Sequence, residues 1–266
     1  MAMTAALDFL VPLFVPGNRP DRFEQAAVAG ADAIILDLED AVPADAKHEA
    51  RTALRGDFTS LPILVRVNGI GTRWHDEDMA AIAGQDFAAV IIPKAEGTAA
   101  FAALCAAFSL PVVALIESAR GLADVCRIVE MQNVARVAFG SIDFCADIGC
   151  AHIREALLAA RSELVLASRL AGLAAPIDGV TTVLDDEDLI TGDARHARDL
   201  GFAGKLCIHP RQIEAIRRGF APNEAEISWA GKVLASGDGA TAVDGAMVDE
   251  PVPVRARAVL QRAGSV

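Results

Sequence analysis

Short apolar runs recur between residue 10 and residue 208, and segments with helical spacing separate them. The runs are apolar at consecutive positions and rich in β-branched residues, which is typical of strands that are buried on both faces. Alanine-rich segments such as TAAFAALCAAF and REALLAARSELVLASRLAGLA lie between them. The predicted strands are residues 10–15, 33–37, 62–67, 88–92, 111–116, 134–139, 177–181 and 204–208.

Eight strands that alternate with helices predict an α/β fold, a TIM-type (β/α)8 barrel with a C-terminal helical extension. The seventh run, IDGVTTV, is the weakest strand and could also be a loop. No linker or low-complexity segment interrupts residues 1–220, so we predict one catalytic barrel domain there. Residues 221–266 exceed what a barrel needs, and they predict a helix starting near Asn223, an extended segment and a terminal helix after Pro253. This extension could pack on a neighbouring subunit or complete its site.

Charge and composition narrow the class of partner. The formal net charge is −12, which argues against nucleic acid and against an anionic membrane surface as the main partner. No apolar run approaches the roughly 18–20 residues that a membrane span requires, and the apolar start lacks the basic region of a signal peptide. Five irregularly spaced cysteines without a CxxC pair are typical of reduced thiols. We therefore expect a cytoplasmic protein.

Charged residues follow several of the predicted strands, whose carboxyl ends meet at one rim of a parallel barrel. Glu117 and Asp143 follow the fifth and sixth strands, and two carboxylates there could bind Mg²⁺, which fills its other positions with water and substrate. Arg66 ends the strand ILVRV and either binds a substrate carboxylate or forms a structural ion pair. Lys94 follows the fourth strand, where we favour a supporting role over a Schiff base.

Basic residues also follow the first two strands. LFVPGNRPDR places Arg19 and Arg22 at the start of a helix, a setting that suits phosphate or carboxylate recognition but also fits a plain loop with solvated arginines. The acidic segment DLEDAV follows the second strand, and we interpret it as a cluster that holds nearby arginines in place. Lys47 comes after it and is expected to be solvated, with a phosphate contact as the alternative.

Together these strand-end motifs resemble the citrate lyase beta-subunit-like branch of the HpcH/HpaI aldolase family. The matching segments are LFVPGNRPDRF, GADAIILDLEDAV, LVRVNGIGT, AAVIIPKAE, VALIESARG, AFGSIDFCADIG, GFAGKLCIHPRQI and DGAMVDEP. The resemblance covers nearly the whole chain and implies a TIM-type barrel that assembles as a homotrimer or a hexamer. It also implies a magnesium-dependent enzyme that makes or breaks a carbon–carbon bond in CoA thioesters such as citryl-, citramalyl- or malyl-CoA.

The resemblance implies roles for particular residues. Glu117 and Asp143 match magnesium ligands, and Glu117 thereby also meets the substrate. Arg66 matches the arginine that binds the substrate carboxylate or the oxo-acid product. Asp249, in MVDEP, matches an aspartate that reaches the active site of an adjacent subunit and transfers a proton at the acetyl methyl carbon. We therefore expect Arg66 and Asp249 to be catalytic.

The same comparison implies that Arg19, with Arg22 and Lys47, meets the phosphates of CoA and that Arg19 also contacts the substrate. One departure concerns the residue before the metal aspartate: many relatives have Glu-Asp where this chain has Ile142-Asp143. This departure leaves the acyl group open.

Three other functions remain open at this point. The first is a pyruvate-type aldolase acting on free hydroxy-oxo acids. The second is a malyl-CoA thioesterase or malate synthase-like activity from the same metal site. The third is a degenerate barrel that binds acyl thioesters without catalysis.

Overall fold

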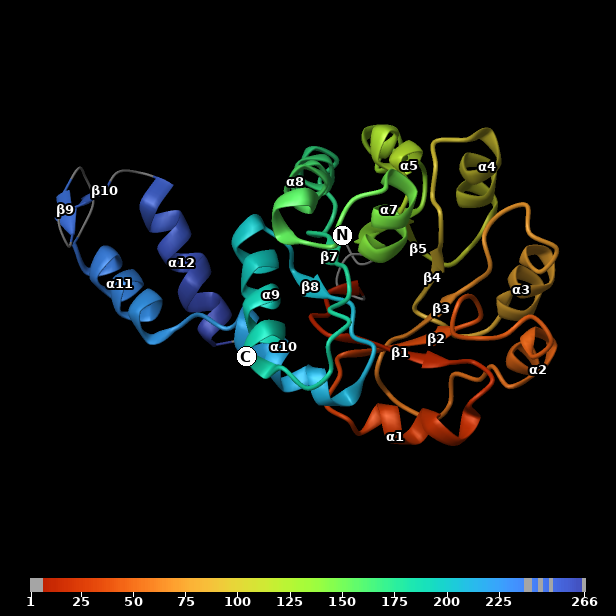
Figure 1. The fold of residues 1–266 in the computed structure, drawn as a ribbon. Coiled ribbons are helices and arrows are strands. Elements are labelled where there is room, and N and C mark those ends of the chain that lie inside the picture. The colour runs from red at the N-terminus through yellow and green to blue at the C-terminus, as the bar shows by residue number, and fades with distance from the viewer. Residues whose placement is uncertain (1–6, 237–240, 244–245, 249–250, 265–266) are drawn as a thin grey trace.

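The predicted barrel is confirmed by a computed structural model, which describes residues 7–236, 241–243, 246–248 and 251–264 (Figure 1). Eight strands pair in parallel and in chain order. Phe14 N–H donates to Cys207 O at 2.8 Å, which joins the last strand segment to the first and closes the ring. The strands are β1 Pro12–Pro16, β2 Ala33–Asp37, β3 Ile63–Arg66, β4 Ala89–Ile92, β5 Val112–Ile116, β6 Val134–Phe139, β7 Ile177–Asp178 and β8 Gly204–Lys205.

Helices surround the barrel, and most of them carry the chain back from the end of one strand to the start of the next. Thr98 starts α4 by accepting from Phe101 N–H at 3.2 Å. Among the described helices, none is long and apolar enough to cross a bilayer. The helices are η2 Pro20–Arg22, α1 Phe23–Ala27, α2 Lys47–Thr52, α3 His75–Ile82, α4 Ala99–Ala107, α5 Ala119–Ala123, α6 Val125–Ile128, α7 Ser141–Ile148, α8 Arg154–Leu170, α9 Glu187–Leu200, η3 Pro210–Gln212 and α10 Ile213–Phe220.

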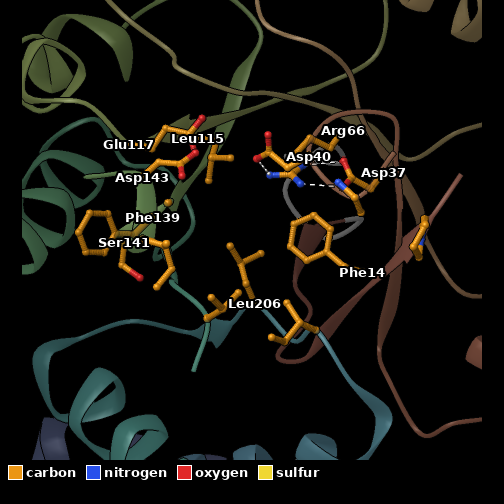
Figure 2. A pocket seen from close by; sticks show the side chains of 16 residues that line it. Phe14, Asp37, Asp40, Arg66, Leu115, Glu117, Phe139, Ser141, Asp143 and Leu206 are labelled. Atoms are coloured by element: carbon orange, nitrogen blue, oxygen red, sulfur yellow. Dashed lines mark hydrogen bonds and ion pairs between the residues drawn. The ribbon is translucent and has the colours of Figure 1, made fainter. Parts of the chain in front are cut away.

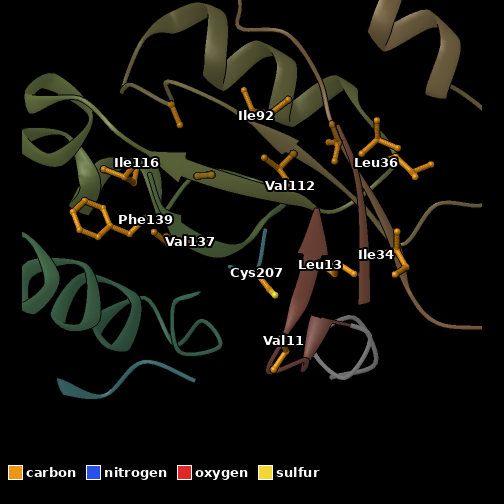
Figure 3. Packing of buried hydrophobic residues seen from close by; sticks show 14 of the residues in the cluster. Val11, Leu13, Ile34, Leu36, Ile92, Val112, Ile116, Val137, Phe139 and Cys207 are labelled. Carbon is orange, nitrogen blue, oxygen red and sulfur yellow. The ribbon is translucent and has the colours of Figure 1, made fainter. Parts of the chain in front are cut away.

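The strands divide the apolar side chains into two layers, because successive side chains of a strand point to opposite faces. In β2, Ile34 and Leu36 pack outward against the helices, whereas Ile35 points into the barrel. Figure 3 shows part of the outer layer. Inside the barrel, the buried Arg136 of β6 donates to the carbonyls of Leu7, Phe9 and Ala175, residues at or before the start of strands. Arg136 thereby fills the interior of the barrel near its amino end, and a cavity lies at the carboxyl end.

The C-terminal extension consists of α11 Glu224–Ala235, the hairpin strands β9 Thr241–Val243 and β10 Ala246–Val248, and α12 Pro251–Ala263. Asn223 and Glu226 form a capping box at the start of α11. The last helix begins at Pro251, three residues before its predicted start after Pro253, because proline is tolerated in a first helical turn. The two helices bury their own small cluster around Val233 and Val259. The division into domains at residue 220 stays a prediction.

Candidate active site at the carboxyl end of the barrel

A cavity of about 520 Å³ opens at the carboxyl ends of the strands. Figure 2 shows Glu117 and Asp143 on one side of it and Arg66 with Asp37 and Asp40 on the other. The predicted carboxylates and the predicted arginine therefore face the same space. Its remaining lining residues are Phe14, Pro16, Ala41, Leu115, Phe139, Gly140, Ser141, Ile142, Val180, Leu206 and Ile208.

Glu117 directly follows β5 and is buried, whereas Asp143, in the first turn of α7, is half-exposed. Burial, and then the neighbouring carboxylate of Glu39, raise the pKa of Glu117 to about 8. A cation placed between these acids would offset that penalty. Within the described ranges, no group of three His, Cys, Asp or Glu side chains could hold a metal. The site thus offers two carboxylates, a donor set that fits magnesium, which keeps several water or substrate ligands.

Glycine at position 140 is required by the position of Glu117. A Cβ atom added to Gly140 would lie 2.3 Å from Glu117 Oε2 and 2.5 Å from its Cβ. Such distances do not occur between non-bonded atoms, so any larger residue would displace the carboxylate or the start of α7. The glycine in AFGSID therefore lets the backbone after β6 lie against the side chain of Glu117, which follows β5.

Lys94 lies among the acids of the site. Its ammonium nitrogen is 3.1 Å from Glu39 Oε1 and 4.0 Å from both Glu117 Oε1 and Asp143 Oδ2. Burial alone would lower the pKa of Lys94, but the carboxylates of Glu39 and Glu117 outweigh it and raise that pKa. The ammonium group therefore stays protonated at neutral pH, which supports the predicted supporting role and argues against a Schiff base. The backbone of Lys94 is left-handed, with φ of 50°, an uncommon conformation for a side-chain-bearing residue.

Arg66 is held in place by the acidic cluster after β2. Its Nε and Nη2 atoms donate to the two carboxylate oxygens of Asp37, each at 2.7 Å. Its Nη1 atom lies 3.1 Å from Glu39 Oε2 and 3.5 Å from Asp40 Oδ2, and its guanidinium lies over the ring of Phe14. The interpretation of DLEDAV as an arginine-holding cluster is confirmed. Arg66 has a structural ion pair and still lines the cavity, so the two alternatives for this residue are compatible.

Arg19 and Arg22 are found on the exposed turn after β1, outside the lining of the cavity. Arg19 donates to both carboxylate oxygens of Asp21, at 2.9 and 2.7 Å. The exposed pair is weak, since solvent screens it. Arg19 can therefore exchange this partner for another anion, and the phosphate contact stays a prediction.

The expectation that Lys47 is solvated is wrong. Its ammonium group is buried and donates to Leu38 O at 2.6 Å, Glu39 O at 2.7 Å and Asn68 Oδ1 at 2.7 Å. Helix α2 packs so closely on the barrel that the lysine reaches the carbonyls that follow β2. The predicted phosphate contact of Lys47 is not tested, but it would compete with these three hydrogen bonds.

Asp249 lies outside the described residues, two positions before the first residue of α12 in the sequence. Its predicted role in proton transfer stays a prediction.

The model of the HpcH/HpaI aldolase/citrate lyase family matches residues 10–210. The chain belongs to this family. A citrate lyase subunit beta-like protein from Deinococcus radiodurans is 35% identical, and the match covers 93% of this chain and 95% of that protein. A (3S)-malyl-CoA thioesterase from Cereibacter sphaeroides is 34% identical, with 96% of this chain and 94% of the relative covered. A relative named for citrate lyase and a relative named for a thioesterase are thus similar to this chain to about the same degree.

Solved structures of similar proteins share the fold over nearly the whole chain. The protein CitE from Mycobacterium tuberculosis, solved with magnesium, acetoacetate and coenzyme A, has a TM-score of 0.87 and 36% identity, and covers 97% of this chain and 99% of its own. Another structure of that protein, with magnesium and pyruvate, has a TM-score of 0.79 and 32% identity. It covers 96% of this chain and 99% of its own.

The sequence did not predict a cluster of polar and charged side chains that lies next to the cavity. His152 Nε2 lies 2.9 Å from Ser141 Oγ, and burial together with Arg161 and Lys205 lowers the pKa of His152. Asp178 accepts from Arg161 Nε at 2.8 Å and from Lys205 Nζ at 3.0 Å, fully out of water. The available signal was the presence of charged residues in the two apolar runs IDGVTTV and GKLCI.

Proposed function

We propose that this chain is a magnesium-dependent carbon–carbon lyase. It cleaves, or forms in reverse, a 3-hydroxy-diacid CoA thioester of the citryl, citramalyl or malyl type, giving an acyl-CoA and an oxo acid. The observation that carries the proposal is the placement of Glu117 and Asp143 across one cavity from the tethered Arg66. The relatives support it, because solved structures of a similar protein contain magnesium with coenzyme A or small acids.

Glu117 and Asp143 would hold the magnesium ion. The fit rests on two carboxylates that line one cavity and on the raised pKa of the buried Glu117. When bound, the ion would act as a Lewis acid that favours the change from hydroxyl to ketone. Lys94 would keep Glu117 in position through its backbone N–H, which donates to Oε1 at 2.8 Å.

The chain itself would bind the acid and move the proton. Arg66, oriented by Asp37, would pair with the substrate carboxylate. Asp249 would protonate the carbon of the departing acyl fragment, and in the reverse direction would remove that proton. Arg19 and Arg22 would meet the CoA phosphates. In the proposed homotrimer or hexamer, Asp249 would serve the site of a neighbouring subunit.

Product analysis tests the reaction. The purified protein is incubated with magnesium and separately with citryl-, citramalyl- and malyl-CoA, and the acyl-CoA, oxo acid and free thiol are quantified. We expect an acyl-CoA and an oxo acid from at least one of the three, with loss of activity in Glu117→Gln and retention in the surface control Asp188→Asn. A folded, magnesium-loaded protein that leaves all three intact would rule out the lyase and favour a binding barrel.

A malyl-CoA thioesterase is the second candidate, favoured by the 34% identity to relatives of that activity. The same experiment separates the two, because a thioesterase releases free CoA thiol and intact malate, whereas a lyase keeps the thioester in its product. Both reactions would need the same carboxylates, so substitutions at Glu117 alone do not distinguish them.

Subunit mixing tests the role of Asp249. Glu117→Gln and Asp249→Asn variants are each expected to be inactive while folded. If Asp249 completes a neighbouring site, co-refolding the two variants restores activity, since some sites then combine an intact Glu117 with an intact Asp249. An active Asp249→Asn variant would instead remove this residue from the mechanism.

A further inference from the structure

Two cysteines lie in contact at the end of helix α7. The Sγ atoms of Cys145 and Cys150 are 3.5 Å apart, and both residues are free thiols. Cys145 belongs to α7, whereas Cys150 follows the helix. The proposed lyase mechanism uses neither thiol. Because the sulfurs of a disulfide are about 2.0 Å apart, these two thiols need only a small movement to become joined.

The backbone at the end of α7 brings the two thiols together. Gly149, with a left-handed φ of 73°, ends the helix, and Cys150 N–H donates to Cys145 O at 3.1 Å. This is the six-residue hydrogen bond of a Schellman motif, and the two residues that it joins commonly make an apolar side-chain contact. Both positions carry thiols in this chain. The contact that closes the helix end is therefore one that an oxidant can make covalent.

The two thiols differ in their access to solvent. Cys145 is buried, with 6% of its surface exposed, whereas Cys150 is half-buried. A small oxidant therefore reaches Cys150 first, since the reactivity of a thiol depends on its exposure. Cys145 lies directly behind it as the second thiol. This arrangement of an accessible cysteine beside a resolving cysteine is typical of redox-sensitive sites.

Helix α7 connects this pair to the cavity. Asp143 lies in the first turn of the helix, two residues before Cys145, and lines the cavity with Glu117 (Figure 2). Glu117 is fixed by the backbone N–H of Lys94 and by its close packing on Gly140. Asp143 is half-exposed, and the ammonium nitrogen of Lys94 is 4.0 Å from it. The position of Asp143 relative to Glu117 therefore depends on the backbone of α7.

We propose that Cys145 and Cys150 form a reversible disulfide in the presence of a hydroperoxide, and that this disulfide weakens magnesium binding at Asp143. The disulfide is inferred from the two thiols alone, whereas its effect on the metal rests on the proposed function. Its formation draws the sulfurs from 3.5 Å to about 2.0 Å, and thereby moves the second turn of α7 and the segment after Gly149 toward each other. Asp143 moves with this helix, while Glu117 stays in place.

The chemistry balances with the hydroperoxide as the oxidant. The thiolate of Cys150 attacks one peroxide oxygen, the oxygen–oxygen bond breaks, and the proton that Cys150 gave up goes to the leaving oxygen. The sulfur of Cys145 then attacks the resulting sulfenic acid. The sulfur–oxygen bond breaks, and the thiol proton of Cys145 leaves with the hydroxide as water. The two thiols lose two electrons, which reduce one peroxide bond, and a dithiol reductant reverses the reaction.

Thiol counting after treatment with hydrogen peroxide tests the disulfide. The exposed Cys126 is replaced first, by Cys126→Ser, so that its own oxidation does not enter the count. This leaves four of the five cysteines, of which Cys105 and Cys207 are fully buried. We expect the four thiols to fall to two after treatment and to return to four with dithiothreitol. Peptide mapping should find the bond between Cys145 and Cys150.

Two further variants of this protein separate the roles of the thiols. In Cys145→Ala, dimedone is expected to label Cys150 as a sulfenic acid, because the resolving thiol is gone. In Cys150→Ala, the buried Cys145 should stay unlabelled and all three remaining thiols should persist. A treated Cys126→Ser protein that keeps its four thiols, or a disulfide that joins other cysteines, would overturn the proposal. Absence of the label in Cys145→Ala would contradict the attack by Cys150.

Magnesium titration tests the effect on the metal site. Calorimetry is expected to give an affinity at least about threefold weaker for the oxidised protein than for the reduced protein, because the metal-binding aspartate is displaced. Re-reduction should restore the first value, and Cys150→Ala should keep its affinity through the same treatment. Unchanged affinity in the oxidised protein would overturn the effect on the metal, as would an equal loss in Cys150→Ala. If the disulfide forms but even the reduced protein binds no magnesium, the proposed function is wrong and the disulfide stands.

Discussion

Lys94 meets Glu117 twice: its backbone N–H donates to Oε1 at 2.8 Å, and its ammonium nitrogen lies 4.0 Å from the same oxygen. The first contact positions the carboxylate, and the second places a positive charge beside it. The backbone of Lys94 is left-handed, and conformations of this kind cluster at functional sites. The ammonium group and a magnesium ion would therefore compete for the same carboxylates.

This competition predicts that Lys94→Met binds magnesium more tightly than the wild type. The backbone donor to Glu117 remains, whereas one repulsive charge next to the ion is removed. We expect about a tenfold gain in affinity, the size of roughly 1.4 kcal/mol, for a partly exposed charge near the binding position. Titration calorimetry with magnesium measures this affinity.

The control Arg195→Met changes the net charge equally at an exposed position on α9 and should leave the affinity unchanged. Weaker binding in Lys94→Met would show that the lysine assists the metal site.

The contact between Gly140 and Glu117 makes a second prediction. In Gly140→Ala the new methyl group would overlap the carboxylate, so we expect at least a tenfold loss of magnesium affinity in a protein that still folds. Magnesium titration and thermal unfolding should be measured together. Gly231→Ala is the matched control: it lies in α11 with open space around it, and is expected to leave metal binding intact and to stabilise the helix by up to about 1 kcal/mol. Unchanged magnesium affinity in Gly140→Ala would contradict the assignment of Glu117.

The barrel and the location of the charged residues could be predicted from the sequence. Buried parallel strands appear as short apolar runs, and their carboxyl ends lie at one rim of the barrel. It predicted β2 and β6 with their observed bounds. It overextended β7 and β8, since the apolar residues after Asp178 and Lys205 line the cavity and extend beyond the paired segments. The hydrophobic pattern alone does not distinguish an apolar residue within a strand from one that lines the cavity after the strand ends.

Side-chain partners were harder to predict, because they depend on how closely the helices approach the strands. The sequence predicts Lys47 to be an exposed residue of a helix, yet its ammonium group donates to three buried oxygens. Ser141 and His152 are brought together by the loop between α7 and α8, and no spacing rule connects them. In contrast, the tether of Arg66 was predictable, since a charged residue ending a buried strand needs a nearby opposite charge.

That tether makes a third prediction, on Asp37. In Asp37→Asn the guanidinium of Arg66 loses its bidentate partner and two neighbouring backbone N–H groups lose a charged acceptor. We expect the free energy of unfolding to fall by about 3 kcal/mol and the affinity for pyruvate, measured in the presence of magnesium, to fall at least tenfold. Urea unfolding and calorimetry measure the two effects. Asp40→Asn is the milder comparison, because its contact with Arg66 is longer and exposed. If Asp37→Asn leaves oxo-acid binding unchanged, Arg66 does not depend on this ion pair for its orientation.

The buried acid behind the cavity makes a prediction about pH. Burial alone would raise the pKa of Asp178, but Lys205 and Arg161 outweigh it and lower that pKa below its ordinary value of 3.8. A carboxyl group whose pKa is lower in the folded state stabilises the fold above its unfolded pKa and loses that contribution as the pH falls through its folded pKa. Asp178→Asn is therefore expected to cost about 3–5 kcal/mol at pH 7, where it leaves two buried cations without their carboxylate. Measured by urea unfolding, the difference from the wild type should shrink as the pH is lowered below about 4.

Asp188→Asn, at an exposed position, should show no comparable loss at pH 7. A difference for Asp178→Asn that stays constant down to pH 2 would mean that the carboxylate charge is not what stabilises this group.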